Sequence, residues 1–317
     1  MTEAVAPLSL RVAEARLLNP LIRMFRLQAA DGGVLPPWEP GSHIKVQVRL
    51  PDGSQDWRHY SLVDLAGDGR RTSAPTDYLI AVRREEGGRG GSLFMHQGLA
   101  VGDRIAVQPP KNDFPLHHGE PPALLIAGGI GITPMASMAS RRHVAGQSVR
   151  LCYAGRSRDL MAFLPELDAL LGDRLTVHAD AEQDGRLDLD RLLDSCTADE
   201  QIYVCGPRVM LDAVLAAVES RGWSRDRVHF ELFLSQATVA GDRPFEVAIA
   251  GTDQVFTVAA NQSLLDCLIE QGCDPMYDCK RGECGVCTTV VAGGEVDHRD
   301  YFLSKPEKDS GKVMQIC

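Results

Sequence analysis

Apolar and polar residues alternate through several short stretches in the first third of the chain. In the stretch at 43–50, Ile44, Val46 and Val48 occupy every second position, which puts them on one face of a strand. Glycine, proline and aspartate separate this stretch from similar ones at 56–63, 77–85 and 103–110. The pattern predicts an antiparallel β-barrel domain over residues 1–115.

The pattern changes near residue 116. Apolar stretches typical of buried parallel strands lie at 123–129, 149–155, 175–180, 201–207 and 227–233. Amphipathic stretches at 161–171 and 208–220 predict helices between them. This alternation predicts a doubly wound α/β domain over residues 116–234.

The rest of the chain differs again. A polar stretch containing glycine at 235–243 is expected to be a linker. Residues 244–317 then form a third domain, with strands expected at 244–251 and 254–260 and a helix at 263–272. The chain is therefore predicted to be a multidomain protein.

Composition and charge narrow the class of protein. The 317 residues exceed what one core usually supports, and 44% hydrophobic with 24% charged residues is a globular composition. The formal charge of −10 disfavours binding to nucleic acid or to anionic membranes. The longest apolar stretch, at 123–132, is too short to span a bilayer, and the first residues lack the features of a secretion signal. We expect a cytoplasmic protein.

The spacing of the cysteines is the most specific signal. Four and then two residues separate Cys279, Cys284 and Cys287, and Cys317 supplies a distant fourth thiol. This is the plant-type spacing for a 2Fe-2S cluster, so these four residues are the predicted metal ligands. The alternative is structural zinc, which usually uses two closely spaced pairs of ligands.

On this spacing and on the order of its three segments, the chain resembles the phthalate dioxygenase reductase family, which includes the reductases of vanillate demethylase and of other Rieske oxygenases. The resemblance implies an FMN-binding barrel, an NAD domain and a C-terminal ferredoxin domain of the β-grasp fold. It implies electron transfer from NADH through FMN and a 2Fe-2S cluster to a Rieske-type oxygenase. We expect a monomer. Family members normally continue past the last cysteine ligand with a closing strand, whereas this sequence ends at Cys317.

Two segments of the barrel match the family's flavin site. Arg58-His59-Tyr60-Ser61 matches its R-x-Y-S motif, in which the arginine can bind phosphate, the tyrosine can pack on the flavin and the serine can donate to the flavin edge. A glycine turn that begins a short helix can close its N–H groups on the phosphate, and it comprises Gly88, Arg89, Gly90, Gly91 and Ser92. By resemblance, Ala81, Val82 and Arg83 also line the flavin. The alternatives are an ordinary surface strand and an ordinary glycine turn.

The second domain carries a modified nucleotide motif. Its turn after the strand at 123–129 matches the family's G-G-x-G-x-T-P pattern and is the predicted pyrophosphate loop, with Gly128, Gly129, Gly131, Ile132, Thr133 and Pro134 as the cofactor-binding residues. Thr133 is expected to contact both cofactors. By resemblance, Cys205, Gly206 and Pro207 flank the nicotinamide, and Phe233 lies near the flavin face. For Cys205 and Phe233, plain core packing is the alternative.

The choice between NADH and NADPH depends on a second turn. Arg156, Ser157 and Arg158 follow the strand at 149–155, where the 2′ group of the adenosine ribose lies, and two guanidiniums could bind a 2′-phosphate. The negative charge of Asp159 disfavours a bound 2′-phosphate, and we predict NADH.

No Ser-His-Asp or Cys-His arrangement is evident, so we predict no catalytic side chain and assign the chemistry to the cofactors. The alternatives to an oxygenase reductase are an electron-transfer subunit of another dehydrogenase and a stand-alone redox module. Residues 243–317 hold seven Lys and Arg against twelve Asp and Glu. We therefore expect Asp274, Asp278 and Glu283, near the cysteine loop, to face a basic patch on the electron acceptor.

Overall fold

The computed structural model describes residues 6–67, 70–117, 119, 121–183, 185–233 and 241–317. It divides into two compact units, residues 1–231 and 232–317. Most of the linker predicted at 235–243 lies outside the described residues. None of the described helices is long and apolar enough to cross a membrane.

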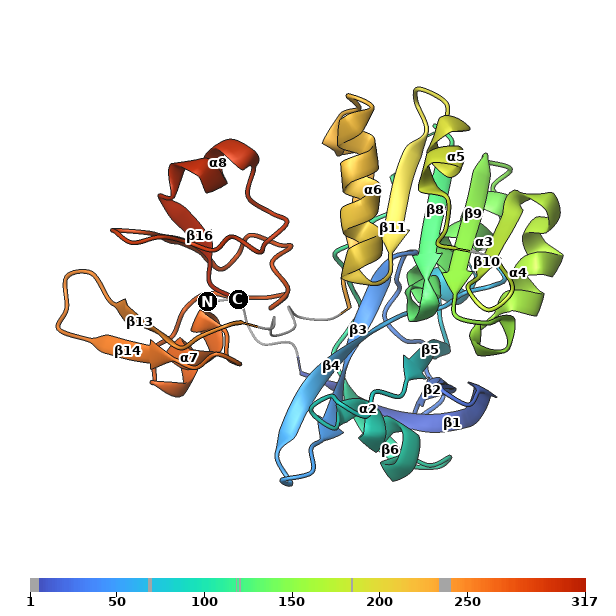
Figure 1. The fold of residues 1–317 in the computed structure, drawn as a ribbon. Coiled ribbons are helices and arrows are strands. Elements are labelled where there is room, and N and C mark those ends of the chain that lie inside the picture. The colour runs from blue at the N-terminus through green and yellow to red at the C-terminus, as the bar shows by residue number, and fades with distance from the viewer. Residues whose placement is uncertain (1–5, 68–69, 118, 120, 184, 234–240) are drawn as a thin grey trace. The chain divides into compact units, whose positions relative to one another are not determined.

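The first part of the larger unit is a seven-stranded antiparallel sheet in the order β4-β3-β6-β1-β2-β5, with β7 paired to β3. The strands are β1 (Leu8–Asn19), β2 (Ile22–Ala29), β3 (Ser42–Arg49), β4 (Gln55–Ser61), β5 (Asp77–Arg83), β6 (Arg104–Val107) and β7 (Lys111–Asn112). The outermost strands β4 and β5 also contact each other, as closure into a barrel requires (Figure 1). Ile44, Val46 and Val48 all point into the core, which confirms the predicted antiparallel domain.

Short helical segments complete this domain, namely α1 (Arg70–Ser73), α2 (Gly91–Leu93) and the π-helical η1 (Phe94–Gly98). The helix predicted after the glycine turn is therefore a short helix that continues into a π-turn. The Arg23 guanidinium donates to the carbonyls of Met95, His96 and Leu99 at the end of η1. It satisfies carbonyl groups that have no partner within so short a helix.

The second part is a five-stranded parallel sheet in the order β10-β9-β8-β11-β12. Its strands are β8 (Ala123–Gly128), β9 (Val149–Gly155), β10 (Leu175–Ala179), β11 (Gln201–Cys205) and β12 (Val228–Glu231). The connecting helices are α3 (Ile132–Val144), α4 (Leu164–Leu171), α5 (Leu189–Asp194) and α6 (Arg208–Ser220). Short 3-10 turns lie at η2 (Gly129–Gly131), η3 (Arg158–Leu160), η4 (Gly172–Arg174) and η5 (Arg225–Arg227).

The strand order reverses between β8 and β11, so the predicted doubly wound fold is confirmed. Right-handed crossovers put α3 and α4 on one face of the sheet and α5 and α6 on the other. The carboxyl ends of β8 and β11 lie side by side, at the point where such sheets bind ligands.

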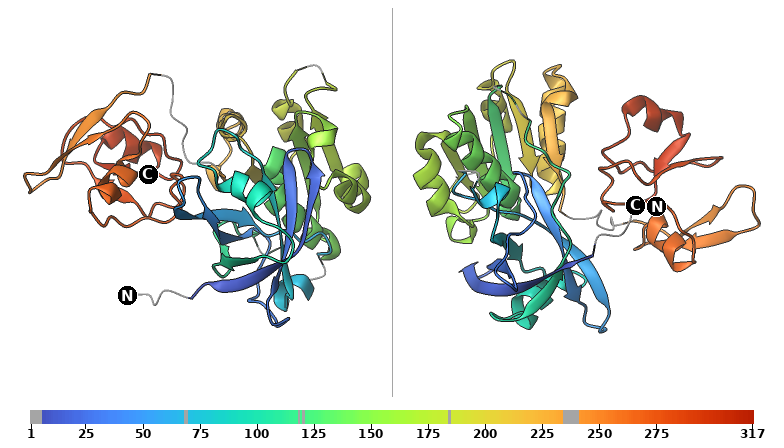
Figure 2. Two further views of the ribbon diagram at one scale, coloured as in Figure 1. Left: turned by 90° about the horizontal axis from the view of Figure 1, so that it is seen from below. Right: turned by 180° about the vertical axis from the view of Figure 1, so that it is seen from behind.

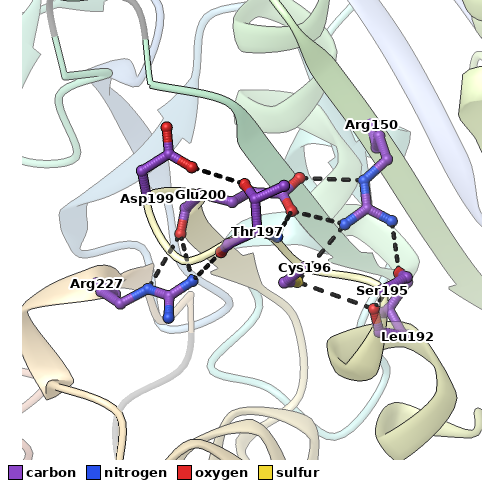
Figure 3. Close-up of polar contacts among 8 residues, drawn as sticks. All are labelled: Arg150, Leu192, Ser195, Cys196, Thr197, Asp199, Glu200 and Arg227. Atoms are coloured by element: carbon purple, nitrogen blue, oxygen red, sulfur yellow. Dashed lines mark hydrogen bonds and ion pairs between the residues drawn. The ribbon is translucent and has the colours of Figure 1, made fainter.

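An ion-pair network secures the opposite, amino-terminal edge of this sheet (Figure 3). Arg150 at the start of β9 donates two hydrogen bonds, of 3.0 and 2.8 Å, to the carboxylate of the buried Glu200. The same guanidinium contacts Ser195 and Cys196, and Arg227 donates to the carbonyls of Thr197 and Glu200. Burial raises the pKa of Cys196 to about 11, so this thiol stays protonated near neutral pH.

The smaller unit contains two antiparallel strand pairs (Figure 2). β13 (Phe245–Ala248) pairs with β14 (Val255–Val258), and β15 (Thr288–Val290) pairs with β16 (Val313–Gln315). α7 (Leu264–Glu270) packs on the first pair, and α8 (Lys305–Ser310) precedes β16. The predicted β-grasp sheet thus takes the form of two separate pairs among the described residues. A shared core that includes Leu265, Cys267, Cys287 and Ile316 joins them, and the Leu265 amide donates to the Ile316 carbonyl.

Candidate functional site

The four predicted ligand cysteines converge in the smaller unit. The Cys287 and Cys317 sulfurs lie 3.2 Å apart, and the Gly282 amide donates to Cys317 Sγ at 3.2 Å. The Arg281 amide donates to Cys279 Sγ at 3.3 Å. Backbone N–H groups directed at sulfur stabilise thiolates and tune the potential of a bound cluster.

Two glycines allow the backbone to wrap so tightly. Gly282 and Gly285 have φ values of +77° and +76°, a region that side chains disfavour. A Cβ at Gly285 would also overlap the ring of Phe302, which lies against the loop. Both glycines therefore hold the loop in a conformation that other residues would strain, and Gly285 also leaves room for the ring of Phe302.

The contacts among the thiols continue from Cys317 to Cys279 and from Cys279 to Cys284. The hydrogen bond with Cys317 lowers the pKa of Cys279 to about 4 and that of Cys287 to about 6, while the pKa of Cys317 is raised. Neighbouring thiolates repel one another, so all four can ionise together only when bound cations neutralise them. The donor set therefore fits an iron–sulfur cluster.

No group of three or more His, Cys, Asp or Glu side chains among the described residues is arranged to hold a single metal ion. A two-iron cluster does not need such a group, because four cysteines are shared between two irons. The pairwise contacts of the four thiols are therefore the relevant geometry.

The two predicted flavin segments meet in the barrel. A Cβ at Gly91 would lie 2.8 Å from Arg58 Nε, so the glycine turn packs directly on the R-x-Y-S strand. Ser61 Oγ and Arg58 Nη2 are both buried and have no hydrogen-bond partner among the described residues. Buried donors almost always have a partner, so these two fit a ligand rich in oxygen and nitrogen acceptors, such as a flavin with its phosphate.

Neighbouring residues orient this site. Asp56 forms an ion pair with Arg58 through Nη1 and lies 3.8 Å from Arg89. Burial opposes ionisation of Asp56, but the hydrogen bond and charge of Arg58 outweigh it and lower the pKa of this carboxyl. Burial raises the pKa of Tyr60, which therefore stays a neutral phenol beside the barrel core. The His59 ring stacks on His43 at 4.8 Å between ring centroids.

The other predicted flavin residues lie on β5 and in the glycine turn. His96 Nε2 lies 2.8 Å from the Val82 carbonyl, which joins β5 to η1. Ala81 and Val82 are buried, and Arg83 pairs with Glu85. The Ser92 hydroxyl accepts from the Glu85 amide at 3.0 Å, so it ties the turn to the end of β5. Gly90 is the N-cap residue of α2 and has φ +90°. Contact of these residues with FMN stays a prediction.

The two predicted nicotinamide segments also meet. A Cβ at Gly131 would overlap the carbonyl oxygen of Cys205, and one at Gly206 would lie 3.1 Å from Gly128 Cα. A Cβ at Gly128 would lie 2.6 Å from Pro207 Cδ. Turns separated by about seventy residues are thus in backbone contact at the carboxyl edge of the sheet. Gly129 has φ +56° and opens the turn.

Helix α3 links the nicotinamide turn to the flavin strand. Its first residues, Ile132, Thr133 and Pro134, are buried, and the Thr133 hydroxyl donates to the Ile130 carbonyl. One turn further, Ser137 Oγ donates to the Leu62 carbonyl and accepts from the Asp64 amide, both at 2.9 Å. Sequence reasoning missed Ser137, because an isolated serine in an apolar helix gives no signal of a partner in another domain.

The remaining predicted residues lie apart from these contacts. Arg156 is exposed after β9, and Ser157 is the N-cap residue of η3. Phe233 lies two residues beyond the end of β12 and belongs to the smaller unit. Their roles stay predictions. Of the acids expected to face a partner, Glu283 does not fit. It accepts a hydrogen bond from the Leu232 amide at 2.5 Å, and its side chain is only 13% exposed.

Comparisons with known proteins agree with this geometry. Residues 125–216 match the model of the oxidoreductase NAD-binding domain, and residues 247–317 match that of the 2Fe-2S iron-sulfur cluster binding domain. The structure is similar to that of phthalate dioxygenase reductase, described as modular and as transferring electrons from pyridine nucleotides to [2Fe-2S]. The TM-score is 0.75 and the identity 33%, over 98% of this chain and 94% of that one.

Two curated relatives are similar over almost their whole lengths. The heme-dependent oxidative N-demethylase beta subunit of Ectopseudomonas mendocina (strain ymp) is 39% identical, over 96% of this chain and 93% of the relative. The vanillate O-demethylase oxidoreductase of Pseudomonas sp. (strain HR199 / DSM 7063) is 38% identical, over 96% of this chain and 94% of the relative. The chain belongs to the phthalate dioxygenase reductase family.

As a member of the phthalate dioxygenase reductase family, the chain is an iron–sulfur flavoprotein oxidoreductase with FMN, NADH and a 2Fe-2S cluster as cofactors. When bound, FMN would supply the link between two-electron hydride transfer from NADH and single-electron transfer to the cluster. The protein's part is to hold the reacting groups. Arg58 and Ser61 would donate to the flavin, and the start of α3 would offer N–H groups to a pyrophosphate.

The close approach at Gly131 gives a testable prediction for this family member. In Gly131→Ala, the new methyl group pushes the glycine turn away from Cys205, so the KM for NADH should rise about tenfold or more. The matched control is Gly146→Asn, because Gly146 follows α3 with φ +69° in open space and asparagine tolerates that conformation. Steady-state reduction of ferricyanide measures the effect. An unchanged KM in Gly131→Ala would show that the contact does not shape the site.

Proposed function

We propose that this chain is the reductase component of a two-component oxygenase or demethylase, that its electron acceptor is a Rieske-type oxygenase, and that it works as a monomer. The observation that carries the proposal is that one chain combines a flavin site, a nicotinamide site and a cluster loop. The names of its relatives, which include an O-demethylase oxidoreductase and an N-demethylase subunit, support an oxygenase as acceptor. The proposal includes domain boundaries at 1–115, 116–234 and 244–317.

The surface near the cluster loop supports a protein acceptor. Met276 is 79% exposed and Phe302 51%, and Tyr277 and Val286 are also exposed. Exposed apolar side chains beside a redox centre suit a short-lived protein contact, which needs little buried area.

The type of acceptor is tested by direct reduction. NADH-reduced protein is mixed in a stopped-flow instrument with a purified Rieske oxygenase component or with a purified heme-dependent demethylase component. We expect rapid reduction of the Rieske centre and slow reduction of the heme. Preference for the heme protein would contradict the Rieske assignment, since one relative is named as a subunit of a heme-dependent enzyme. Sedimentation velocity tests the monomer.

Electrostatic docking is tested by salt. The excess of acidic residues after residue 242 should attract a basic partner, so added salt should slow reduction of the oxygenase far more than reduction of the flavin by NADH. Since Glu283 is turned inward, the variant is Asp274→Asn, an exposed acid five residues before Cys279. This variant should weaken the salt dependence, whereas Asp253→Asn, an exposed acid between β13 and β14, should not. If added salt slows the reduction of the flavin by NADH as much as the reduction of the oxygenase, electrostatic docking is contradicted.

A further inference from the structure

Two turns lie side by side beyond the carboxyl ends of β9 and β10. The strands are paired in register up to Ala179 and Gly155. Beyond them, the Asp180 amide donates to the Gly155 carbonyl and the Ala181 amide donates to the Arg156 carbonyl, both at 2.9 Å. The side chains of residues 156–159 and 180–182 therefore share one edge of the sheet.

This edge is where the adenosine ribose of a dinucleotide lies. β8 carries the glycine turn, and β9 is its neighbour, with Gly128 opposite Ala154. In doubly wound nucleotide domains, the residues after the strand next to the glycine-turn strand meet the 2′ group of this ribose. A side chain here can therefore distinguish a 2′-hydroxyl from a 2′-phosphate.

The charges at this edge do not favour a phosphate. Arg158 Nε donates to Glu182 Oε2 at 2.8 Å, so one of the two guanidiniums is already paired. Asp159 and Asp180 are exposed close by, which gives three carboxylates against Arg156 and Arg158. A 2′-phosphate would have to displace Glu182 from Arg158 and remain near its charge, whereas a 2′-hydroxyl could donate to a carboxylate.

We propose that Glu182 is a specificity-determining residue, which excludes the 2′-phosphate of NADPH by pairing with Arg158 and so selects NADH. The ion pair is about half exposed, so its own contribution to stability is small. The ion pair affects the choice of ligand, because it occupies Arg158, which the sequence suggested as a ligand of the 2′-phosphate. Removing the carboxylate leaves both guanidiniums available.

The test uses ligand binding as well as activity. Isothermal titration of the intact flavoprotein compares adenosine 2′,5′-bisphosphate with 5′-AMP, which differ only in the 2′-phosphate. In Glu182→Gln, we expect affinity for the bisphosphate to rise about tenfold and affinity for 5′-AMP to stay unchanged. The ratio of kcat/KM for NADPH to that for NADH should rise by a similar factor.

Two further variants separate the mechanism from a general change in charge. Glu219→Gln removes another exposed carboxylate, at the far end of α6, and should leave both affinities unchanged. Adding Arg158→Gln to Glu182→Gln should abolish the gain. The proposal is overturned if Glu182→Gln does not improve binding of the bisphosphate, if Glu219→Gln improves it equally, or if the gain persists without Arg158.

Discussion

The Cys284→Ser variant is expected to lose its iron–sulfur absorbance and its reduction of cytochrome c, while NADH still bleaches its flavin. Serine keeps the size of the side chain but removes the soft sulfur ligand, and one missing ligand leaves an iron incompletely held. The predicted flavin residues lie in the other compact unit of the chain, which has a core of its own and does not depend on this loop for its fold. Iron content, visible absorbance and anaerobic titration with NADH measure the three effects.

The matched control for this loss is Cys273→Ser. Cys273 is a partly buried thiol in the same unit that packs beside the core and is not among the predicted ligands. This variant should keep its iron and its rate of cytochrome c reduction. Iron content that stays normal in Cys284→Ser, or is lost equally in Cys273→Ser, would contradict the assignment of the ligands.

The Arg58→Gln variant is expected to bind FMN about 10- to 100-fold more weakly. Arg58 Nη2 is buried without a partner among the described residues, and a charged hydrogen bond to phosphate typically contributes about 1.5–3 kcal/mol. Quenching of FMN fluorescence during titration of the flavin-free protein measures the dissociation constant. The flavin content after purification should fall as well.

Arg49→Gln is the control for the flavin prediction. Arg49 is an exposed residue at the end of β3 in the same sheet, and its replacement removes the same charge. FMN affinity should not change in this variant. If the two substitutions weaken binding equally, Arg58 acts only through the net charge of the domain, and the R-x-Y-S strand is not the phosphate site.

Much of the fold could be predicted from the sequence because the signals are local. The helix expected at 208–220 and the strand expected at 149–155 have those bounds in the structure, since apolar periodicity is set by neighbouring residues. The helix expected at 161–171 begins only at Leu164, because Phe163 takes a left-handed conformation ahead of the proline at the helix start. The cysteine spacing was informative for a similar reason, since three of the four thiols lie within nine residues of one another.

Contacts between distant residues required the tertiary structure. Glu283 looked like a docking acid in sequence, but folding turns it toward the Leu232 amide, 51 residues away. Glu182 carried no signal until the register of β9 and β10 brought it to Arg158.

The sequence by itself determined the three kinds of domain, and it supplied the predicted thiol ligands and the predicted residues of the flavin and nicotinamide sites, because each depends on residue type and short spacing. Only the tertiary structure decided which of these segments touch. It joined Gly91 to Arg58, Gly131 to Cys205, and Ser137 to Leu62 across 75 residues. Such pairings depend on how strands and helices pack, and packing is a property of the whole fold that no single stretch of sequence encodes.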